Sequence, residues 1–132
     1  MDYFLKVLGQ QKTFYAECEC YQQGKRTGFV DNAIKLGGKW CFVEVKLNVH
    51  AEPHLHDQLK KYCHAERVVL QKGERTLTQE KVWQNTMLVI DTTAFYFYDF
   101  LADELTFLKN LDEIRTEADI EVLRKKVIPL LQ

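Results

Sequence analysis

Three side chains near the middle of the chain have types and a spacing suited to phosphodiester hydrolysis. Glu44 and Lys46 lie two residues apart in the segment WCFVEVKLN, and Asp31 precedes them in the segment GFVDNAIK. In an extended strand, residues two apart share a face, so Glu44 and Lys46 would be neighbours. Two carboxylates suit a hard divalent cation such as Mg²⁺, with Mn²⁺ as a substitute. A lysine beside them could orient the attacking water and stabilise the charge of the transition state.

The surrounding sequence predicts the strands that would bring these side chains together. Residues 28–35 and 40–48 are rich in strand-forming residues and are separated by a turn at Gly37 and Gly38. Neighbouring strands of such a hairpin lie about 5 Å apart, so Asp31 would face Glu44. The backbone carbonyl of Val45 lies between the two polar side chains and would supply a third oxygen ligand to the metal.

A further strand is expected over residues 12–22, where Phe14, Ala16, Cys18 and Cys20 alternate onto one face. Helices are expected at residues 2–11, 54–66 and 112–131, and strands at 86–91 and 94–99. The periodicity leaves residues 68–70 as a short strand or a helix end, 71–84 as a loop or short helix, and 101–111 as a loop with a short extended piece. This order predicts one α+β domain over residues 1–132, with a β-meander and flanking helices around a mixed sheet.

The predicted helix after the hairpin carries the next pair of polar residues. Gln58 and Tyr62 are four positions apart in the segment DQLKKYC and therefore share a helix face. An aspartate, then Glu-x-Lys, then a helix with this Gln and Tyr resembles the PD-(D/E)xK nuclease superfamily. The match looks most like the RecB-type nucleases and the N-terminal nuclease domains of type I restriction enzymes. With the later segment TMLVIDTTAFYFYD, the resemblance covers about residues 13–100.

The resemblance implies a restriction-endonuclease-like αβββαβ core and a Mg²⁺-dependent endonuclease that acts on DNA. By position, Asp31 and Glu44 would bind the metal and Lys46 would be the catalytic lysine. Gln58 and Tyr62 would support the site or contact DNA, and the neighbouring lysines Lys60 and Lys61 could contact phosphates. Such a small domain could work as a homodimer or within a larger restriction, repair or mobile-element complex.

Two departures from the family pattern bear on activity. Val30 stands where the family's proline would precede the aspartate, a change that removes no chemical group. Many members also take an acid from the first helix, and here that helix offers only Asp2. Glu17 and Glu19 lie on the first predicted strand and are poor substitutes for that acid.

Two other interpretations remain open from the sequence. A Glu-x-Lys pair opposite an aspartate also occurs on ordinary solvated strand faces, where the ion pair is worth about 0.2–1 kcal/mol. The chain could therefore be a degenerate nuclease fold that binds DNA or a partner protein without cutting. It could also be an unrelated α+β interaction domain.

Charge gives weak support for a phosphate substrate. The 132 residues carry a formal net charge of −1, but residues 1–75 hold 12 lysines and arginines against 9 aspartates and glutamates. The predicted site therefore lies in the more basic part of the chain. The N-terminus lacks the pattern of a signal peptide and no apolar run is long enough to span a bilayer, which predicts a cytoplasmic protein with no membrane partner.

The cysteines and histidines suggest a second, weaker possibility. Four cysteines without a CxxC pair are expected to be free thiols in a reducing cytosol. His50, His54, His56 and His64 lie near Cys63 in sequence, which leaves a zinc site as an alternative, although the spacing fits poorly.

Overall fold

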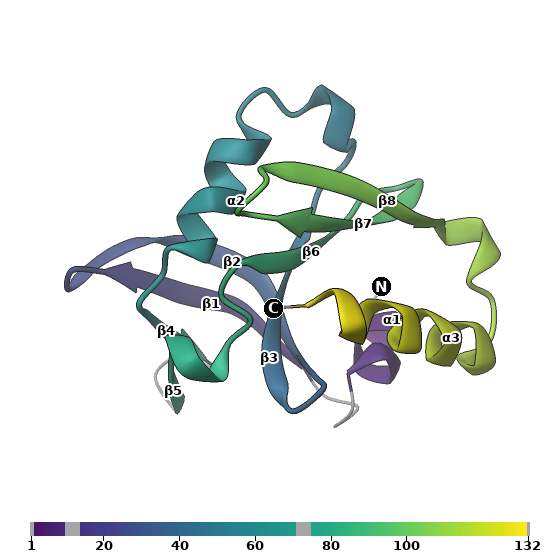
Figure 1. Cartoon of the computed structure of the whole chain (residues 1–132), viewed down its shortest axis with the longest axis horizontal. Coiled ribbons are helices and arrows are strands. Elements are labelled where there is room, and N and C mark those ends of the chain that lie inside the picture. The colour runs from purple at the N-terminus through teal and green to yellow at the C-terminus, as the bar shows by residue number, and fades with distance from the viewer. Residues whose placement is uncertain (1, 10–13, 71–74, 132) are drawn as a thin grey trace.

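The computed structural model describes residues 2–9, 14–70 and 75–131 of the chain. It shows an α+β fold in which one mixed sheet of eight strands has helices on both faces (Figure 1). The strands follow the order β5-β4-β1-β2-β3-β6-β7-β8. All neighbours are antiparallel except β3 and β6, which are parallel. A parallel pair needs a long crossover, and α2, β4 and β5 lie in the chain between β3 and β6.

The elements have the following bounds. The strands are β1 (Phe14–Gln22), β2 (Lys25–Leu36), β3 (Lys39–Val45), β4 (Arg67–Leu70), β5 (Arg75–Thr78), β6 (Thr86–Ile90), β7 (Ala94–Asp99) and β8 (Glu104–Asn110). The helices are α1 (Asp2–Leu8), α2 (Leu55–Cys63) and α3 (Glu117–Val127). Within the described part of the chain, no helix is long and apolar enough to cross a membrane.

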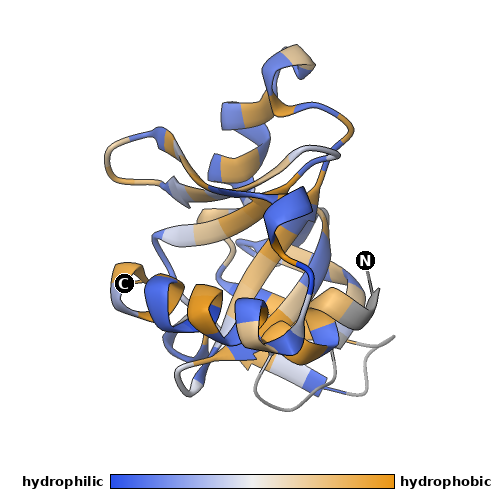
Figure 2. Ribbon diagram, turned by 90° about the vertical axis from the view of Figure 1, so that its right-hand side faces the viewer, coloured by the Kyte–Doolittle hydropathy of each residue, from blue (hydrophilic) through white to orange (hydrophobic). Residues whose placement is uncertain are grey.

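Apolar side chains form one core on each face of the sheet. Helix α2 packs on the first face through Leu55, Leu59 and Tyr62. Helices α1 and α3 cover the second face through Leu5, Leu8, Ile120, Leu123 and Val127. Strand β6 contributes alternate residues to both cores, so all five of its residues are buried. Figure 2 shows these central strands as mostly apolar.

Most predicted elements are confirmed, and the differences have local causes. The meander of β1, β2 and β3, the Gly37-Gly38 turn, α2, β6 and β7 all appear. Helix α2 stops at Cys63 because the chain turns into β4, where the Glu66 N–H donates to the Tyr21 carbonyl at 2.9 Å. The predicted helix over 112–131 is shorter: α3 spans Glu117–Val127, with 3-10 turns at Leu111–Glu113 and Ile128–Leu130. Helix α3 starts at Glu117 because Thr116 caps its first turn by accepting a hydrogen bond from the Asp119 N–H.

Two regions that were expected to be mainly loop contain strands. Residues 101–111 contain β8, and residues 71–84 contain β5, although positions 71–74 lie outside the described residues. Both are the outermost strands of the sheet. In β8 only Leu108 is buried, so the strand lacks the apolar alternation that identifies a half-buried strand.

Strands β1 and β2 both break their alternation at one paired position. Tyr15 and Cys18 lie on the α2 face although they are three residues apart, and so do Val30 and Ala33 on β2. Glu17 and Asp31 lie between the pairs Ala16–Asn32 and Cys18–Val30 and are not themselves paired, and Glu17 has a φ of +53°. The prediction that alternate residues of β1 share one face is therefore wrong, since Ala16 is exposed while Cys18 and Cys20 are buried. The side chain of Phe14 lies outside the described residues.

Candidate active site

The predicted hairpin brings Asp31 and Glu44 together where β2 and β3 stop pairing. The backbone ladder ends at Asn32 opposite Val43. One residue further, side chains replace the ladder: the Asp31 N–H donates to Glu44 Oε1 at 3.2 Å, and the Val45 N–H donates to Asp31 Oδ2 at 2.8 Å. Because the alternation of β2 breaks at Asp31, its carboxylate can reach sideways to the backbone of β3.

Lys46 lies beside these carboxylates but outside the strand. Strand β3 ends at Val45, whereas the sequence predicted a strand to residue 48. The Lys46 ammonium is 3.2 Å from Glu44 Oε2 and donates to Gln58 Oε1 at 2.6 Å. Its side chain is 13% exposed, so the cation is largely enclosed between the hairpin and α2. Gln58 therefore contacts the lysine directly from α2.

Tyr62 completes the cluster from the next turn of α2. It is buried, and its ring lies 3.6 Å from where a Cβ of Gly28 would be. Burial raises the pKa of Tyr62, and the nearby carboxylates of Glu44 and Asp31 raise it further. The phenol therefore remains protonated and available as a hydrogen-bond donor to Glu44.

Glu44 is the most perturbed acid of the cluster. It is 2% exposed. Burial raises the pKa of Glu44 to about 7, the hydrogen bond and charge of Asp31 add to this, and the Lys46 ammonium opposes it. A carboxyl with this pKa is partly protonated at neutral pH, and a divalent cation bound beside it would hold it ionised.

The donor set that could hold a metal consists of Asp31, Glu44 and the Val45 carbonyl. The N–H and C=O of one strand residue point to the same side, so the Val45 carbonyl also lies toward Asp31. Oxygen donors of this kind suit Mg²⁺, which keeps several waters in its coordination shell. Among the described residues, no three His, Cys, Asp or Glu side chains are grouped to hold a metal.

Neither Glu17 nor Glu19, the two alternatives whose side chains the structure describes, is grouped with Asp31 and Glu44 as a third acid. Glu19 is engaged elsewhere, since it accepts hydrogen bonds from Tyr21 at 3.2 Å and Arg26 at 3.3 Å. Glu17 is exposed. The side chain of Asp2 lies outside the described residues.

The two lysines predicted to contact DNA lie in different places. Lys60 forms an ion pair with Asp103 at 3.0 Å, on the flank of α2 away from Lys46. The structure therefore does not bring Lys60 to Asp31, Glu44 and Lys46. Lys61 is exposed, and its Cδ lies 3.9 Å from the point where a Cβ on Gly28 would be. With Gln58, His54 and Asp57 it lines an open hollow beside the site.

The histidines separate onto different aromatic rings of the sheet. His50, His56 and His64 pack edge-on against Tyr96, Tyr98 and Phe100, with ring centroids 6.2, 5.7 and 4.7 Å apart. These three histidines therefore do not converge on one point where they could bind a zinc ion together.

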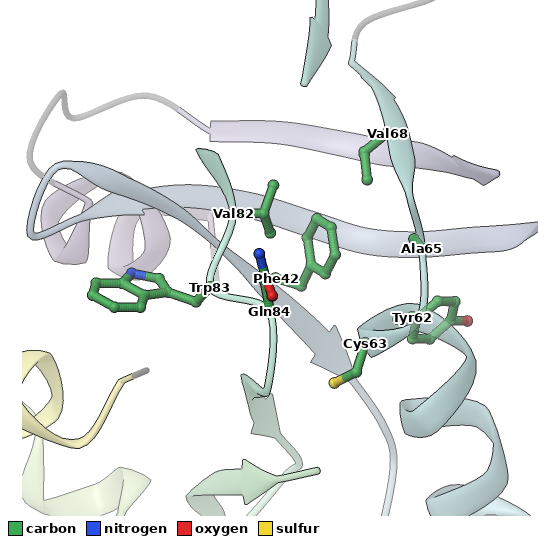
Figure 3. A pocket seen from close by; sticks show the side chains of 8 residues that line it. All are labelled: Phe42, Tyr62, Cys63, Ala65, Val68, Val82, Trp83 and Gln84. Carbon is green, nitrogen blue, oxygen red and sulfur yellow. The ribbon is translucent and has the colours of Figure 1, made fainter. Parts of the chain in front are cut away.

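A small apolar hollow near the C-terminal end of α2 is distinct from the acidic cluster. Phe42, Cys63, Val68 and Val82 are among the residues that line it (Figure 3). The Tyr62 ring borders this hollow, but its hydroxyl points away from it (Figure 3). The hollow is lined by no carboxylate and no lysine or arginine, so we place the candidate chemistry at Asp31, Glu44 and Lys46.

Asp91 is a supporting residue that sequence reasoning missed. It is 2% exposed and accepts hydrogen bonds from the N–H groups of Val49 at 3.0 Å, Thr93 at 2.9 Å and Ala94 at 2.9 Å. Burial opposes its ionisation, but these bonds hold the pKa of Asp91 below its usual value. The carboxylate thus ties the turn after β6 to the loop that follows Lys46. An aspartate before two threonines was a signal for such a side-chain-closed turn.

Replacing Asp91 with alanine should lower the free energy of unfolding by about 2 kcal/mol, because several buried N–H groups lose their acceptor. Urea unfolding at pH 7 would measure the change. Asp112→Ala, at an exposed position, is the matched control and should change stability by less than about 0.5 kcal/mol. Equal stabilities for the two variants would show that Asp91 does not hold this loop.

Comparison with family models, curated proteins and solved structures gave no significant match. The geometry of the cluster therefore carries the functional interpretation. Two carboxylates, a backbone carbonyl and an enclosed lysine can bind a divalent cation and act on a phosphate group.

Proposed function

We propose that the protein is a metal-dependent nuclease that hydrolyses DNA phosphodiester bonds, with a PD-(D/E)xK type of site on a restriction-endonuclease-like fold. The observation that carries this proposal is the enclosure of Asp31, Glu44 and Lys46 in one cluster. On an ordinary solvated strand face these side chains would be exposed. Here Glu44 is 2% exposed, and burying an ionisable acid costs stability that a surface ion pair would not.

The proposed roles follow from the contacts of each residue. Mg²⁺ or Mn²⁺, held by Asp31, Glu44 and the Val45 carbonyl, would polarise the phosphoryl oxygen and lower the pKa of a bound water. Lys46 would orient that water and stabilise negative charge as it develops on the phosphate. Gln58 fixes the lysine at 2.6 Å, and Tyr62 offers a neutral donor at the edge of the cluster.

A second candidate is a module that binds DNA or a partner protein without cutting. Two observations favour it. The described acids near the site number only two, and both already accept hydrogen bonds from protein N–H groups. The net charge of −1 also gives little general attraction to a polyanion.

Cleavage assays with labelled single-stranded, duplex and branched DNA test the proposal. We expect cleavage of at least one form in Mg²⁺ or Mn²⁺ and none in EDTA, because the carboxylates alone cannot activate water. DNA binding without cleavage in either metal would favour the second candidate. Neither binding nor cleavage would reject both.

A further inference from the structure

A second polar cluster lies on the flank of α2 away from Lys46. Three donors converge on the carboxylate of Asp103: His56 Nδ1 at 2.8 Å and the Tyr98 hydroxyl at 2.8 Å on Oδ1, and Lys60 Nζ at 3.0 Å on Oδ2. A carboxylate only accepts, so His56 Nδ1 carries the proton. The hydrogen bonds from His56, Tyr98 and Lys60 hold the pKa of Asp103 well below its usual range. The three donors therefore surround an anion.

The donors belong to the body of the fold, whereas the acceptor comes from an exposed turn. His56 and Lys60 lie one helical turn apart on α2, and Tyr98 is fully buried on β7. Asp103 lies between β7 and β8, is 42% exposed and has a φ of +53°. The turn is closed separately by Asp99, whose Oδ1 accepts from the Leu101 N–H at 3.0 Å. The turn therefore does not depend on the Asp103 carboxylate.

His56 and Asp103 of this cluster also line a hollow on the surface. Its polar lining consists of His50, His56, Tyr96, Asp103 and Thr106, together with the acids Glu52 and Glu104. Glu52 also lines the hollow that contains Gln58 and Lys61. Glu52 therefore borders both hollows, close to the N-terminal end of α2.

We propose that His56, Lys60 and Tyr98 form a binding site for a phosphate group of the substrate strand, and that Asp103 occupies this site in the free protein. A phosphodiester, like a carboxylate, presents two acceptor oxygens that share a negative charge, so it fits the same donors. The choice of a nucleic-acid phosphate rests on the proposed nuclease function. The anion site itself rests only on the contacts of Asp103.

Removing the Asp103 carboxylate should expose the site to an external anion. Inorganic phosphate is titrated into metal-free protein carrying Lys46→Ala, which removes the cation of the candidate active site. The His56 ring signals are followed by NMR. Adding Asp103→Ala should tighten phosphate binding by about tenfold, because the competing charged hydrogen bonds are lost. Adding His56→Ala or Lys60→Ala to this variant should return phosphate binding to its original affinity. Calorimetry measures the affinity of these variants, because His56→Ala removes the ring signals that the NMR titration follows.

Asp112→Ala is the matched control, since it removes one exposed carboxylate outside the cluster. If Asp103→Ala binds phosphate no more tightly than Asp112→Ala, the anion site is rejected. Asp103→Gly removes the acceptor and suits the positive φ of this position, so it gives the same test should the alanine variant be unstable. Repeating the titration with a short single-stranded oligonucleotide tests whether the ligand is a nucleic acid. If Asp103→Ala tightens the binding of phosphate but not of the oligonucleotide, the nucleic-acid assignment is rejected. Each readout is binding, so it is independent of whether the wild type cuts DNA.

Discussion

Lys46→Ala is expected to lower the rate of metal-dependent DNA cleavage by about 100- to 1,000-fold, the range seen when one group that stabilises transition-state charge is removed. The alanine variant should still fold, because Lys46 lies beyond the end of β3 and its backbone N–H keeps the 2.9 Å bond to the Ile90 carbonyl. Cleavage rates at saturating Mg²⁺, with thermal unfolding as a check on folding, would measure the effect.

Two further variants make this result specific. Lys125→Ala removes the same charge from an exposed position on α3 and should cut DNA at the wild-type rate. Lys46→Arg keeps the charge but cannot place a compact ammonium between Glu44 and Gln58, so it should recover only part of the activity. Equal rates for Lys46→Ala and wild type would remove Lys46 from the active site.

Glu44 should make the metal-free protein less stable as the pH rises from about 4.5 to about 7. In the unfolded chain its pKa has the ordinary value of 4.5, and burial raises it to about 7 in the folded protein. Between these values the folded protein binds more protons than the unfolded chain, so the free energy of unfolding falls as the pH rises. At 1.36 kcal/mol per pKa unit, the loss reaches about 3 kcal/mol and is complete above the folded pKa.

Glu44→Gln isolates this effect, because the amide cannot ionise but can still accept the hydrogen bond from the Asp31 N–H. Urea unfolding at pH 4.5, 6 and 7.5 in EDTA should show the variant gaining stability relative to wild type as the pH rises. Glu66→Gln, on an exposed position, should follow the wild type throughout. A difference between Glu44→Gln and wild type that does not change with pH would show that Glu44 titrates normally.

Local pattern was enough to predict the part of the site that depends on neighbours in sequence. The glycine turn between the two strands correctly predicted that Asp31 would lie beside Glu44. The i, i+4 spacing predicted that Gln58 and Tyr62 share a face of α2, and the family resemblance placed that face at the site. The same helical geometry explains why Lys60 is not at the site. It lies two residues after Gln58, about 200° around the helix, and therefore faces Asp103.

The remaining features depend on contacts that no local pattern contains. The role of Asp91 arises only because the turn after β6 packs against the loop after β3, so that Asp91 meets the Val49 N–H. At Glu17 and Asp31, β1 and β2 both lose the alternation of buried and exposed side chains. The sequence of either strand taken alone does not reveal this break. Strand β8 was missed because an edge strand with a single buried residue has little apolar signal.

The parallel pairing of β3 with β6 has a consequence for the order of folding. All five side chains of the cluster come from residues 31–62, so a nascent chain that has emerged only as far as α2 already contains every reactive group. The Ile90 carbonyl that holds the Lys46 amide, and the Thr92 hydroxyl that donates to the Leu47 carbonyl at 2.9 Å, are translated later. Contacts so distant in sequence form late because they close a long loop. The chemical groups would thus be present early, and the latent site would become competent only when the second half of the sheet docks.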